Sequence, residues 1–414
     1  MICKPRTKAA PLLDVHDSDS VSLVPGETLA PSAVGKTSPT TNTLQKNDSS
    51  KQDSVATDKS HRGKIIEVRK SKETTDDNTD CKKDVSKSAE NVTSTSLNSQ
   101  RELKFSMQTG GNDREKKTDM VVQRLREFAW MCDNLSAQQF QREFERLPEP
   151  DMRICKAWLE PHNLRKNRYN NVPCIDSTRI LITFCRKEAG AGYIHANRIE
   201  YPTLRNKYIV TQGPLPETVN TFWEMIWQEN VACIVMLCRT IEDGKRKCAE
   251  YFSSNFNVLT RYGQLNVVLK NRKWEGEIIT SLLEVNYLQE SRTITHHQWE
   301  NWSDFKAPGD NILVGLLQKV RGRSTVVVHC SAGIGRSGTF MALEMCLQDL
   351  ANGISVNVFQ VVVHLRKYRA LAVQTFDQYL SIYRTILQMG EKHGTISKAE
   401  VQRFYRIYEQ HIGN

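Results

Sequence analysis

Long apolar runs are missing from this 414-residue chain, so no stretch is apolar enough to cross a bilayer or to resemble a secretory signal. Cys-x-x-Cys pairs and Cys/His spacings typical of zinc sites are also absent. The eleven cysteines are odd in number and irregularly spaced, which indicates reduced thiols rather than a disulfide scaffold. We therefore expect a cytoplasmic protein without a membrane span or metal; a basic cluster at residues 61–70 leaves a nuclear location open.

Aromatic residues are nearly missing from the first 115 positions, where Phe105 is the only Phe, Tyr or Trp. This segment is rich in Ser, Thr, Asp and Lys and cannot bury enough apolar surface to fold. We expect residues 1–118 to form a disordered tail and residues 119–414 to form one folded domain. By composition, the tail is a candidate docking segment for regulatory partners.

The formal net charge of +10 falls almost wholly on the predicted domain, because residues 1–115 hold 18 basic and 17 acidic residues. A basic domain suits acidic, phosphorylated substrates. No nucleic-acid-binding motif accompanies the charge, so we expect no nucleic-acid partner, although a basic surface alone leaves that interpretation open.

The most informative stretch is residues 326–340, where a β-branched run leads through a Cys and a Gly-rich turn into a helical pattern. This pattern predicts a buried strand, a turn and a buried helix. The turn amides and the helix dipole favour an anion. Cys330, beside that anion site and a cation, is expected to be an ionised nucleophile. Arg336 offers a guanidinium fork for two phosphate oxygens.

Three other interpretations compete for this stretch. A single Cys after an apolar strand is usually a small buried hydrophobe. Residues 333–338 also satisfy the dinucleotide fingerprint G-x-G-x-x-G, but no acidic residue follows at the required distance, since Asp349 comes too early and lies in the predicted helix. A nucleoside-triphosphate loop would end in Gly-Lys-Ser or Gly-Lys-Thr, which is absent here.

The motif His-Cys-x5-Arg at residues 329–336 resembles the signature loop of the tyrosine-specific protein phosphatases. It departs from the usual pattern at Ile334, where Val is commoner, and at Ser337, where Thr is commoner. The resemblance covers about residues 120–400 and implies an α/β domain with a twisted mixed β-sheet flanked by helices. It also implies hydrolysis of phosphotyrosine in proteins through a cysteinyl-phosphate intermediate, with no cofactor.

Roles within the signature loop follow from the same resemblance. Cys330 would be the nucleophile, Arg336 would bind phosphate, and the Ser337 hydroxyl would ease departure of the thiolate. His329 would support the loop. The phosphate-binding amides would come from five residues, namely Ser331, Ala332, Gly333, Ile334 and Gly335.

Residues 166–172 read by themselves as a polar surface loop with one anchored Tyr. They resemble the phosphotyrosine-recognition loop of the family, in which Tyr169 would stack on the substrate ring in a deep cleft. Such depth would select against phosphoserine and phosphothreonine. Asn171 would contact the substrate but stands where the family usually has Asp, so we expect altered peptide affinity.

Asp304 follows Trp302 in a predicted loop, where an Asp alone would indicate a turn or a helix cap. The segment resembles the mobile Trp-Pro-Asp loop of the family, with Asp304 as general acid and Trp302 as a supporting residue. Ser303 stands where Pro is usual. Because Pro fixes φ and lacks an N–H, its loss is expected to make loop closure less favoured.

Two further segments acquire roles by resemblance. Residues 242–247 alone predict a solvated hairpin tip, whereas the family pairs Glu242 with Arg336 and directs Lys247 toward the acid loop. A helix is predicted over residues 356–371. Beyond it, Gln374 and Gln378 are expected on one face of a helical turn. By resemblance to the family, both would hold the attacking water, and Gln374 would also contact substrate.

A second interpretation stays open because three residues depart from the family pattern. These are Ser303, Asn171 and His195, the last of which stands where the family usually has Asn. The second interpretation is a catalytically weak or inactive phosphotyrosine-binding module. A dual-specificity phosphatase is a further alternative, which the loop with Tyr169 disfavours.

Overall fold

The computed structural model describes residues 111–184, 192–309 and 312–412. The predicted tail therefore lies almost wholly outside the described residues, and its boundary at residue 119 stays a prediction. Helix α2 (Gly111–Asn134) begins upstream of that boundary. Across the described ranges, the helices are too short or too polar to cross a membrane.

A nine-stranded mixed sheet forms the centre of the domain. The three central pairings, β3 with β11, β11 with β4 and β4 with β10, are parallel, and the outer pairings are antiparallel. In sheet order the strands are β1 (Arg179–Leu181), β2 (Tyr193–Ile199), β3 (Lys207–Thr211), β11 (Thr325–His329), β4 (Cys233–Met236), β10 (Glu290–Trp299), β9 (Ile278–Tyr287), β8 (Leu265–Glu275) and β7 (Leu259–Tyr262).

The apolar pattern explains why the parallel strands lie at the centre. Strands β4 and β11 are buried along their whole length, as parallel strands covered on both faces should be. Strands β9 and β10 instead mix buried and exposed positions, which suits antiparallel strands at the flank of the sheet.

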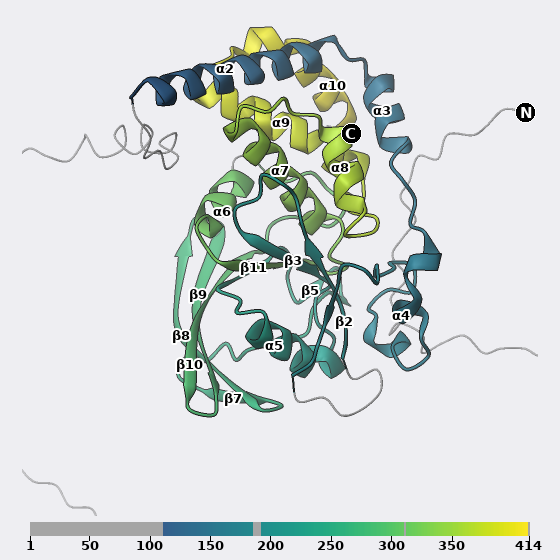
Figure 1. Ribbon diagram of the computed structural model, residues 1–414, viewed down its shortest axis with the longest axis vertical. Helices are drawn as coiled ribbons and strands as arrows, with labels where there is room; N and C mark the ends of the chain where they lie inside the picture. The colour runs from purple at the N-terminus through teal and green to yellow at the C-terminus, as the bar shows by residue number, and fades with distance from the viewer. Residues whose placement is uncertain (1–110, 185–191, 310–311, 413–414) are drawn as a thin grey trace, which may run out of the picture. The chain divides into compact units, whose positions relative to one another are not determined.

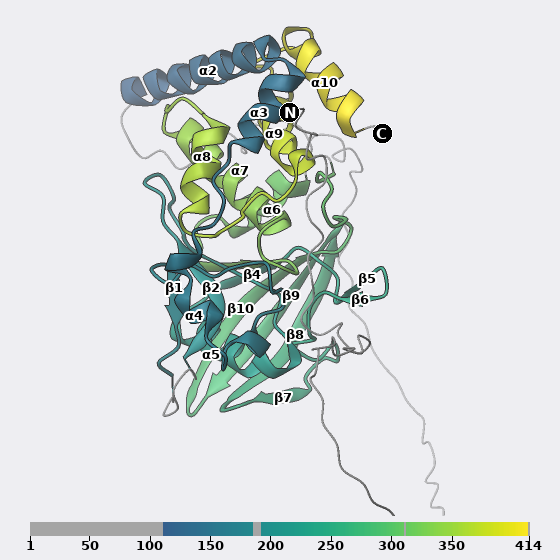
Figure 2. The same ribbon diagram turned by 90° about the vertical axis from the view of Figure 1, so that its right-hand side faces the viewer.

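Helices cover both faces of the sheet, with α6 to α9 on one face and α5 on the other (Figures 1 and 2). The predicted α/β class with a mixed sheet flanked by helices is confirmed. Beyond α2, the helices are α3 (Ala137–Glu145), α4 (Lys156–Leu159), α5 (Val219–Gln228), α6 (Ile312–Val320), α7 (Arg336–Ala351), α8 (Val358–Arg366), α9 (Phe376–Lys392) and α10 (Gln402–Ile412), with short 3-10 turns at Met152–Ile154, Leu164–Lys166, Pro216–Thr218 and Lys398–Val401.

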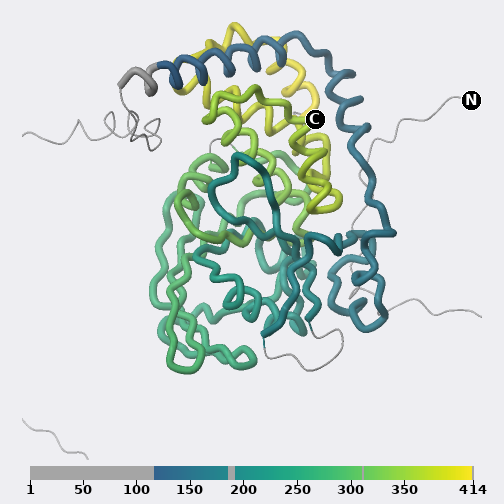
Figure 3. Tube along the Cα trace, viewed as in Figure 1, coloured from purple at the N-terminus to yellow at the C-terminus, as the bar shows by residue number. Residues whose placement is uncertain are grey.

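The first and last described helices lie side by side, as the chain trace shows (Figure 3). Aromatic rings join α2 and α3 to the C-terminal part of the chain. Phe128 stacks on Tyr383 with ring centroids 5.8 Å apart, and Phe140 meets the same ring edge-on at 5.0 Å. These contacts tie the start of the domain to helix α9.

The helix predicted over residues 356–371 is shorter than expected, because α8 ends at Arg366. Leu371 and Val373 adopt left-handed φ values of 61°, which no α-helix accommodates. The Arg366 side chain donates to the carbonyls of Ala372 and Val373, so tertiary hydrogen bonds replace further helical turns. The segment after α8 is thereby turned back toward the end of strand β11.

Candidate active site

The signature loop joins the C-terminal end of β11 to the first residue of α7, Arg336. Gly333 has a φ of 69°, and a Cβ there would collide with the carbonyl oxygen of Thr211. Only glycine fits that close approach. The turn therefore lies directly against the end of strand β3, and its Gly333 amide faces the Cys330 sulfur.

Cys330 is buried, with 2% of its surface exposed, and its Sγ accepts a hydrogen bond from the Gly333 N–H at 3.2 Å. The N-terminus of the 16-residue helix α7 follows a few residues later. An amide donor and a helix N-terminus both favour negative charge at this position. The structure thus places the predicted nucleophile where an anion is stabilised.

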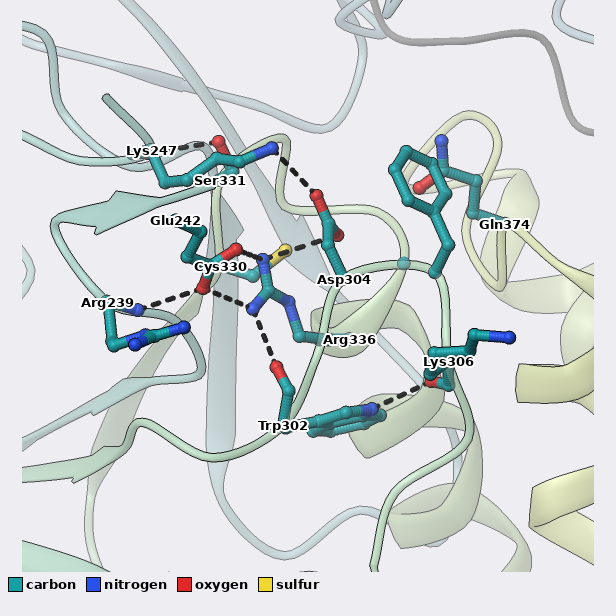
Figure 4. A network of polar contacts seen from close by, with 12 residues as sticks. Arg239, Glu242, Lys247, Trp302, Asp304, Lys306, Cys330, Ser331, Arg336 and Gln374 are labelled. Atoms are coloured by element: carbon teal, nitrogen blue, oxygen red, sulfur yellow. Dashed lines mark hydrogen bonds and ion pairs between the residues drawn. The ribbon is translucent and has the colours of Figure 1, made fainter. Parts of the chain in front are cut away.

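Arg336 is completely buried and makes a forked ion pair with Glu242 (Figure 4). Its two terminal nitrogens lie 2.6 and 3.0 Å from the two Glu242 oxygens. Burial by itself would lower the pKa of Arg336, but its hydrogen bond to the Glu242 carboxylate and the charge of Asp304 outweigh burial and raise that pKa. Arg336 Nε has no hydrogen-bond partner among the described residues.

Glu242 lies on the hairpin of strands β5 (Ile241–Glu242) and β6 (Lys245–Arg246), so the predicted hairpin and its pairing with Arg336 are both present. The Glu242 carboxylate also accepts the backbone N–H of Arg239 at 3.0 Å. A buried guanidinium needs such a partner, because an unpaired buried charge is strongly destabilising.

The loop that carries Asp304 lies against the signature loop (Figure 4). Asp304 Oδ1 is 3.2 Å from Arg336 Nη2, and Oδ2 is 3.1 Å from Lys247 Nζ. The Trp302 carbonyl accepts a hydrogen bond from Arg336 at 2.9 Å. The structure therefore brings together the proposed acid, its predicted Lys neighbour and the signature Arg.

Tyr169 is buried beside the signature loop, and its hydroxyl lies 2.8 Å from Ser331 Oγ. Its ring packs in one apolar cluster with Val172, Ala332 and Ile334. The segment that carries Tyr169 is thus joined to the signature loop. Asn171 lies in the turn after Tyr169 and is half-buried.

The expectation that Gln374 and Gln378 share one face of a helix is wrong, because Gln374 precedes helix α9. Thr375 is the N-cap, and Gln378 Oε1 accepts the backbone N–H groups of Gln374 and Thr375 at 3.1 and 3.3 Å. Both carboxamides nevertheless converge on the signature loop. A Cβ built on Gly335 would lie 2.9 Å from Gln374 Oε1 and 3.0 Å from Gln378 Nε2.

Arg369 is a supporting residue that the sequence did not reveal. It is fully buried and donates to the carbonyls of Gly333 and Ala332 at 3.0 and 2.9 Å, and to Asn197 Oδ1 at 2.7 Å. Those two carbonyls therefore point toward Arg369, which leaves the opposite side of the turn to the amides. The sequence signal was only an Arg near an apolar helix, and nothing there indicated its target.

His329 joins the signature loop to a buried polar chain that the sequence also did not reveal. Its Nδ1 lies 3.1 Å from the Cys330 carbonyl, which can only accept, so Nδ1 carries the proton. Nε2 then accepts from the Tyr251 hydroxyl at 2.9 Å. Tyr251 in turn accepts from His296 Nε2 at 2.6 Å. Burial lowers the pKa of His329 to about 4 and lowers that of His296 well below its usual value, so both rings are neutral at pH 7.

Comparisons with known proteins agree with this geometry. The family model for protein-tyrosine phosphatase matches residues 163–388. The chain is 36% identical over 263 residues to human tyrosine-protein phosphatase non-receptor type 9, covering 58% of this chain and 44% of that protein. It is 35% identical over 243 residues to human non-receptor type 18, covering 56% of this chain and 53% of that one.

The solved structure of the catalytic domain of human protein tyrosine phosphatase non-receptor type 18 superimposes with a TM-score of 0.56 at 31% sequence identity, covering 63% of this chain and 99% of that chain. The chain thus matches about half the length of these curated relatives and nearly the whole of a solved catalytic domain. The family match spans more than half of the sequence and contains Cys330, Arg336 and Asp304. The chain therefore belongs to the protein-tyrosine phosphatase family.

Proposed function

We propose that this protein hydrolyses phosphotyrosine in proteins through a cysteinyl-phosphate intermediate. The observation that carries the proposal is the convergence of three groups. Cys330 Sγ lies in an amide-lined turn, Arg336 begins the following helix, and Asp304 lies 3.2 Å from the same guanidinium. A nucleophile, a phosphate-binding fork and an acid are the components that phosphate-monoester cleavage needs.

In the first step, the Cys330 thiolate attacks phosphorus and the bond from phosphorus to the tyrosine oxygen breaks. The electron pair of that bond goes to the phenolic oxygen, which takes a proton from the Asp304 carboxylic acid. The amides of residues 331–335 and the guanidinium of Arg336 bind the equatorial oxygens of the transferring group. The buried Arg336 Nε supports this role, because it has no hydrogen-bond partner among the described residues.

In the second step, water attacks phosphorus and the phosphorus–sulfur bond breaks, which returns its electron pair to Cys330. Asp304, now ionised, takes a proton from the water. Ser337 Oγ and Gln378 Nε2 are both buried and make no hydrogen bond to any described residue. We assign the Ser337 hydroxyl to the departing thiolate, and the carboxamides of Gln374 and Gln378 to the water.

Substrate selection is assigned to Tyr169 and Asn171, which follow each other closely in the recognition loop. Tyr169 is held at the signature loop through Ser331, a position from which its ring can face an aromatic substrate side chain. We infer that phosphotyrosine-containing proteins are the substrates. The related type 18 enzyme has been studied on distinct HER2 tyrosine phosphorylation sites. The non-receptor relatives support a cytoplasmic location.

The competing function is a phosphotyrosine-binding module without turnover. The residues Ser303, Asn171 and His195 motivate it. Asp304 is nevertheless held between Arg336 and Lys247, although Ser303 replaces the usual Pro. His195 Nε2 lies 2.9 Å from the Val172 carbonyl, which can only accept, so the imidazole donates this bond and supports the segment that carries Tyr169. The contacts of Asp304 favour the enzyme.

The test is hydrolysis of a phosphotyrosine peptide by the purified full-length chain, compared with Cys330→Ser and Asp304→Ala. Cys330→Ser should abolish turnover and retain peptide binding, because a serine hydroxyl is a far weaker nucleophile than a thiolate. Asp304→Ala should lower kcat by about 10² to 10⁴, the usual contribution of a positioned acid. Turnover undiminished in Cys330→Ser would refute the mechanism.

A phosphothreonine peptide of the same sequence serves as the specificity control. We expect negligible hydrolysis of that peptide, because a shorter side chain would not carry its phosphate past Tyr169 to Cys330. Binding of the phosphotyrosine peptide without any wild-type turnover would instead establish the binding module.

A further inference from the structure

The loop that carries Asp304 receives a hydrogen bond from a direction that the catalytic roles do not explain. Thr375 Oγ1 donates to the Phe305 carbonyl at 2.8 Å. Phe305 directly follows Asp304, whereas Thr375 lies between Gln374 and helix α9. The contact therefore connects the loop that carries Asp304, residues 302–308, which we call the acid loop, to the segment that carries the Gln374 and Gln378 carboxamides.

The Phe305 backbone needs external support to keep its conformation. Its φ is 63°, in the left-handed region that side-chain-bearing residues rarely adopt. Such a conformation persists only where surrounding contacts impose it. The bond to its carbonyl is one such contact, and the Trp302 indole, which donates to the Lys306 carbonyl at 2.8 Å, is another.

Thr375 has both its donor and its acceptor capacity in use. Its hydroxyl hydrogen goes to the Phe305 carbonyl, and its oxygen accepts the Gln378 N–H at 3.2 Å as the N-cap of α9. The same cap turn directs the side chains of Gln374 and Gln378 at Gly335. One hydroxyl thus joins the acid loop to the turn that presents the two carboxamides.

We propose that Thr375 is a positioning residue that latches the Asp304 loop against the signature loop. The latch holds Asp304 beside Arg336 and couples placement of the acid to placement of Gln374 and Gln378. This inference rests on the proposed function and deepens it. It is strengthened by Ser303, because a loop without the usual fixed φ depends more on its contacts.

The test compares Thr375→Val, which removes the hydroxyl at nearly constant shape, with Thr375→Ser, which keeps it. Two substrates that differ in how much their leaving group needs a proton distinguish misplacement of Asp304 from general damage to the active site. Phenyl phosphate releases a phenol that, like tyrosine, has a pKa of about 10 and needs a proton. Nitrophenyl phosphate releases a much more acidic phenol, which departs with little help from an acid.

We expect Thr375→Val to lower kcat/KM, which reports the step that releases the phenol, by roughly threefold to tenfold for phenyl phosphate, the range for one lost hydrogen bond. The loss for nitrophenyl phosphate should be about twofold or less, and Thr375→Ser should restore both rates. In amide hydrogen exchange, residues 302–308 should exchange faster in Thr375→Val. That second measurement does not depend on activity.

Loss of the helix cap is controlled in two ways. Asn357→Ala removes the N-cap of α8, where Asn357 Oδ1 accepts the Gln360 N–H at 3.0 Å, and should alter neither the substrate ratio nor loop exchange. Thr375→Asp keeps a good N-cap but its carboxylate donates no hydrogen bond. It should reproduce the pattern of Thr375→Val, and it provides a second variant if the valine protein does not fold.

Equal slowing on both substrates, or failure of Thr375→Ser to restore the rates, would overturn the latch. So would unchanged loop exchange in Thr375→Val and Thr375→Asp. If the wild-type protein turns over neither substrate, the proposed function fails, and hydrogen exchange alone then decides whether the latch exists.

Discussion

The signature loop and the acid loop meet at Arg336 but are built in opposite ways. Every residue of the signature loop from Cys330 to Gly335 is buried, and strand β11 and helix α7 fix its two ends. Arg369 donates hydrogen bonds to two of its carbonyls. The acid loop exposes Ser303 and Lys306, and its contacts to the rest of the domain come largely from side chains. One loop is part of the core, whereas the other lies on its surface.

This difference matches the tasks of the two loops in the proposed mechanism. A nucleophile and its anion-binding amides are most effective when they are fixed before substrate arrives. An acid that covers the bound phosphate must also move aside, so a loop held by a few polar contacts suits it. Asp304 makes an ion pair with the Arg336 guanidinium, and in the proposed mechanism the phosphoryl group binds the same guanidinium. The position of the acid loop and the binding of phosphate are therefore coupled.

The largest expected effect comes from breaking the contact where the two loops meet. Arg336→Lys keeps the positive charge but loses the planar guanidinium, whose terminal nitrogens pair with Glu242 and whose Nε is left for phosphate. We expect kcat to fall by about 10² to 10³, the usual result of removing a transition-state donor. Steady-state kinetics on a phosphotyrosine peptide will measure it.

Arg403→Lys is the matched control, because Arg403 is exposed on α10. It should leave kcat unchanged. Near-normal turnover in Arg336→Lys would contradict the assignment of a bidentate fork.

An intermediate effect, on folding stability, is expected from the buried chain of His296, Tyr251 and His329 that supports the signature loop. The loop that carries Asp304 has no contact with this chain among the hydrogen bonds described above. His296 is neutral in the folded protein because burial lowers its pKa well below 6.5, whereas the unfolded chain binds a proton near pH 6.5. The unfolded state therefore holds more protons below that pH, so stability is lost as the pH falls. Between pH 7.5 and 5, His296 alone should account for about 2 kcal/mol of this loss.

Urea unfolding at pH 7.5 and 5 will measure this loss in wild type and in His296→Gln. The Gln amide can donate to Tyr251 but takes up no proton, so the variant should lose about 2 kcal/mol less than wild type over the same interval. His162→Gln changes an exposed histidine and serves as the control. An identical pH slope in wild type and His296→Gln would show that His296 does not contribute.

The smallest expected effect comes from making the acid loop more like the signature loop. Ser303→Pro restricts φ in the open conformation of the acid loop, and so reduces the conformational entropy lost when the loop closes. A gain of about 0.4 to 1 kcal/mol in closure corresponds to a rise of roughly twofold to fivefold in kcat for phenyl phosphate. A decrease would mean that the closed loop needs the Ser303 N–H or a φ that Pro cannot adopt.

The chemistry was predictable from sequence wherever residues close in the chain act together. Strand β11, the glycine turn and helix α7 are contiguous, so the position of Cys330 before a helix follows from apolar pattern and turn residues alone. The hairpin with Glu242 was also readable as a charged turn. Its pairing with Arg336 came only from family resemblance, since 94 residues separate the two.

Predictions failed or fell short where a distant contact decided the local conformation. Helix α8 ends early because the Arg366 side chain donates to the carbonyls of Ala372 and Val373. Gln374 and Gln378 have helical spacing, yet Thr375 caps α9 between them, so the first carboxamide precedes the helix. Spacing along the chain could not show where the helix begins.

The sequence by itself determined the signature turn, because the turn depends on local apolar periodicity and on glycine at a position that excludes a Cβ. It also placed the proposed nucleophile, Cys330, in that turn, whereas the mixed α/β domain was expected from the family resemblance. Only the tertiary structure decided which groups support them. Arg369 beneath the loop, the chain from His296 through Tyr251 to His329, and the bond from Thr375 to Phe305 all join distant segments. Their hydrogen bonds are directional and short-ranged, so they exist only after the core has fixed the positions of both partners.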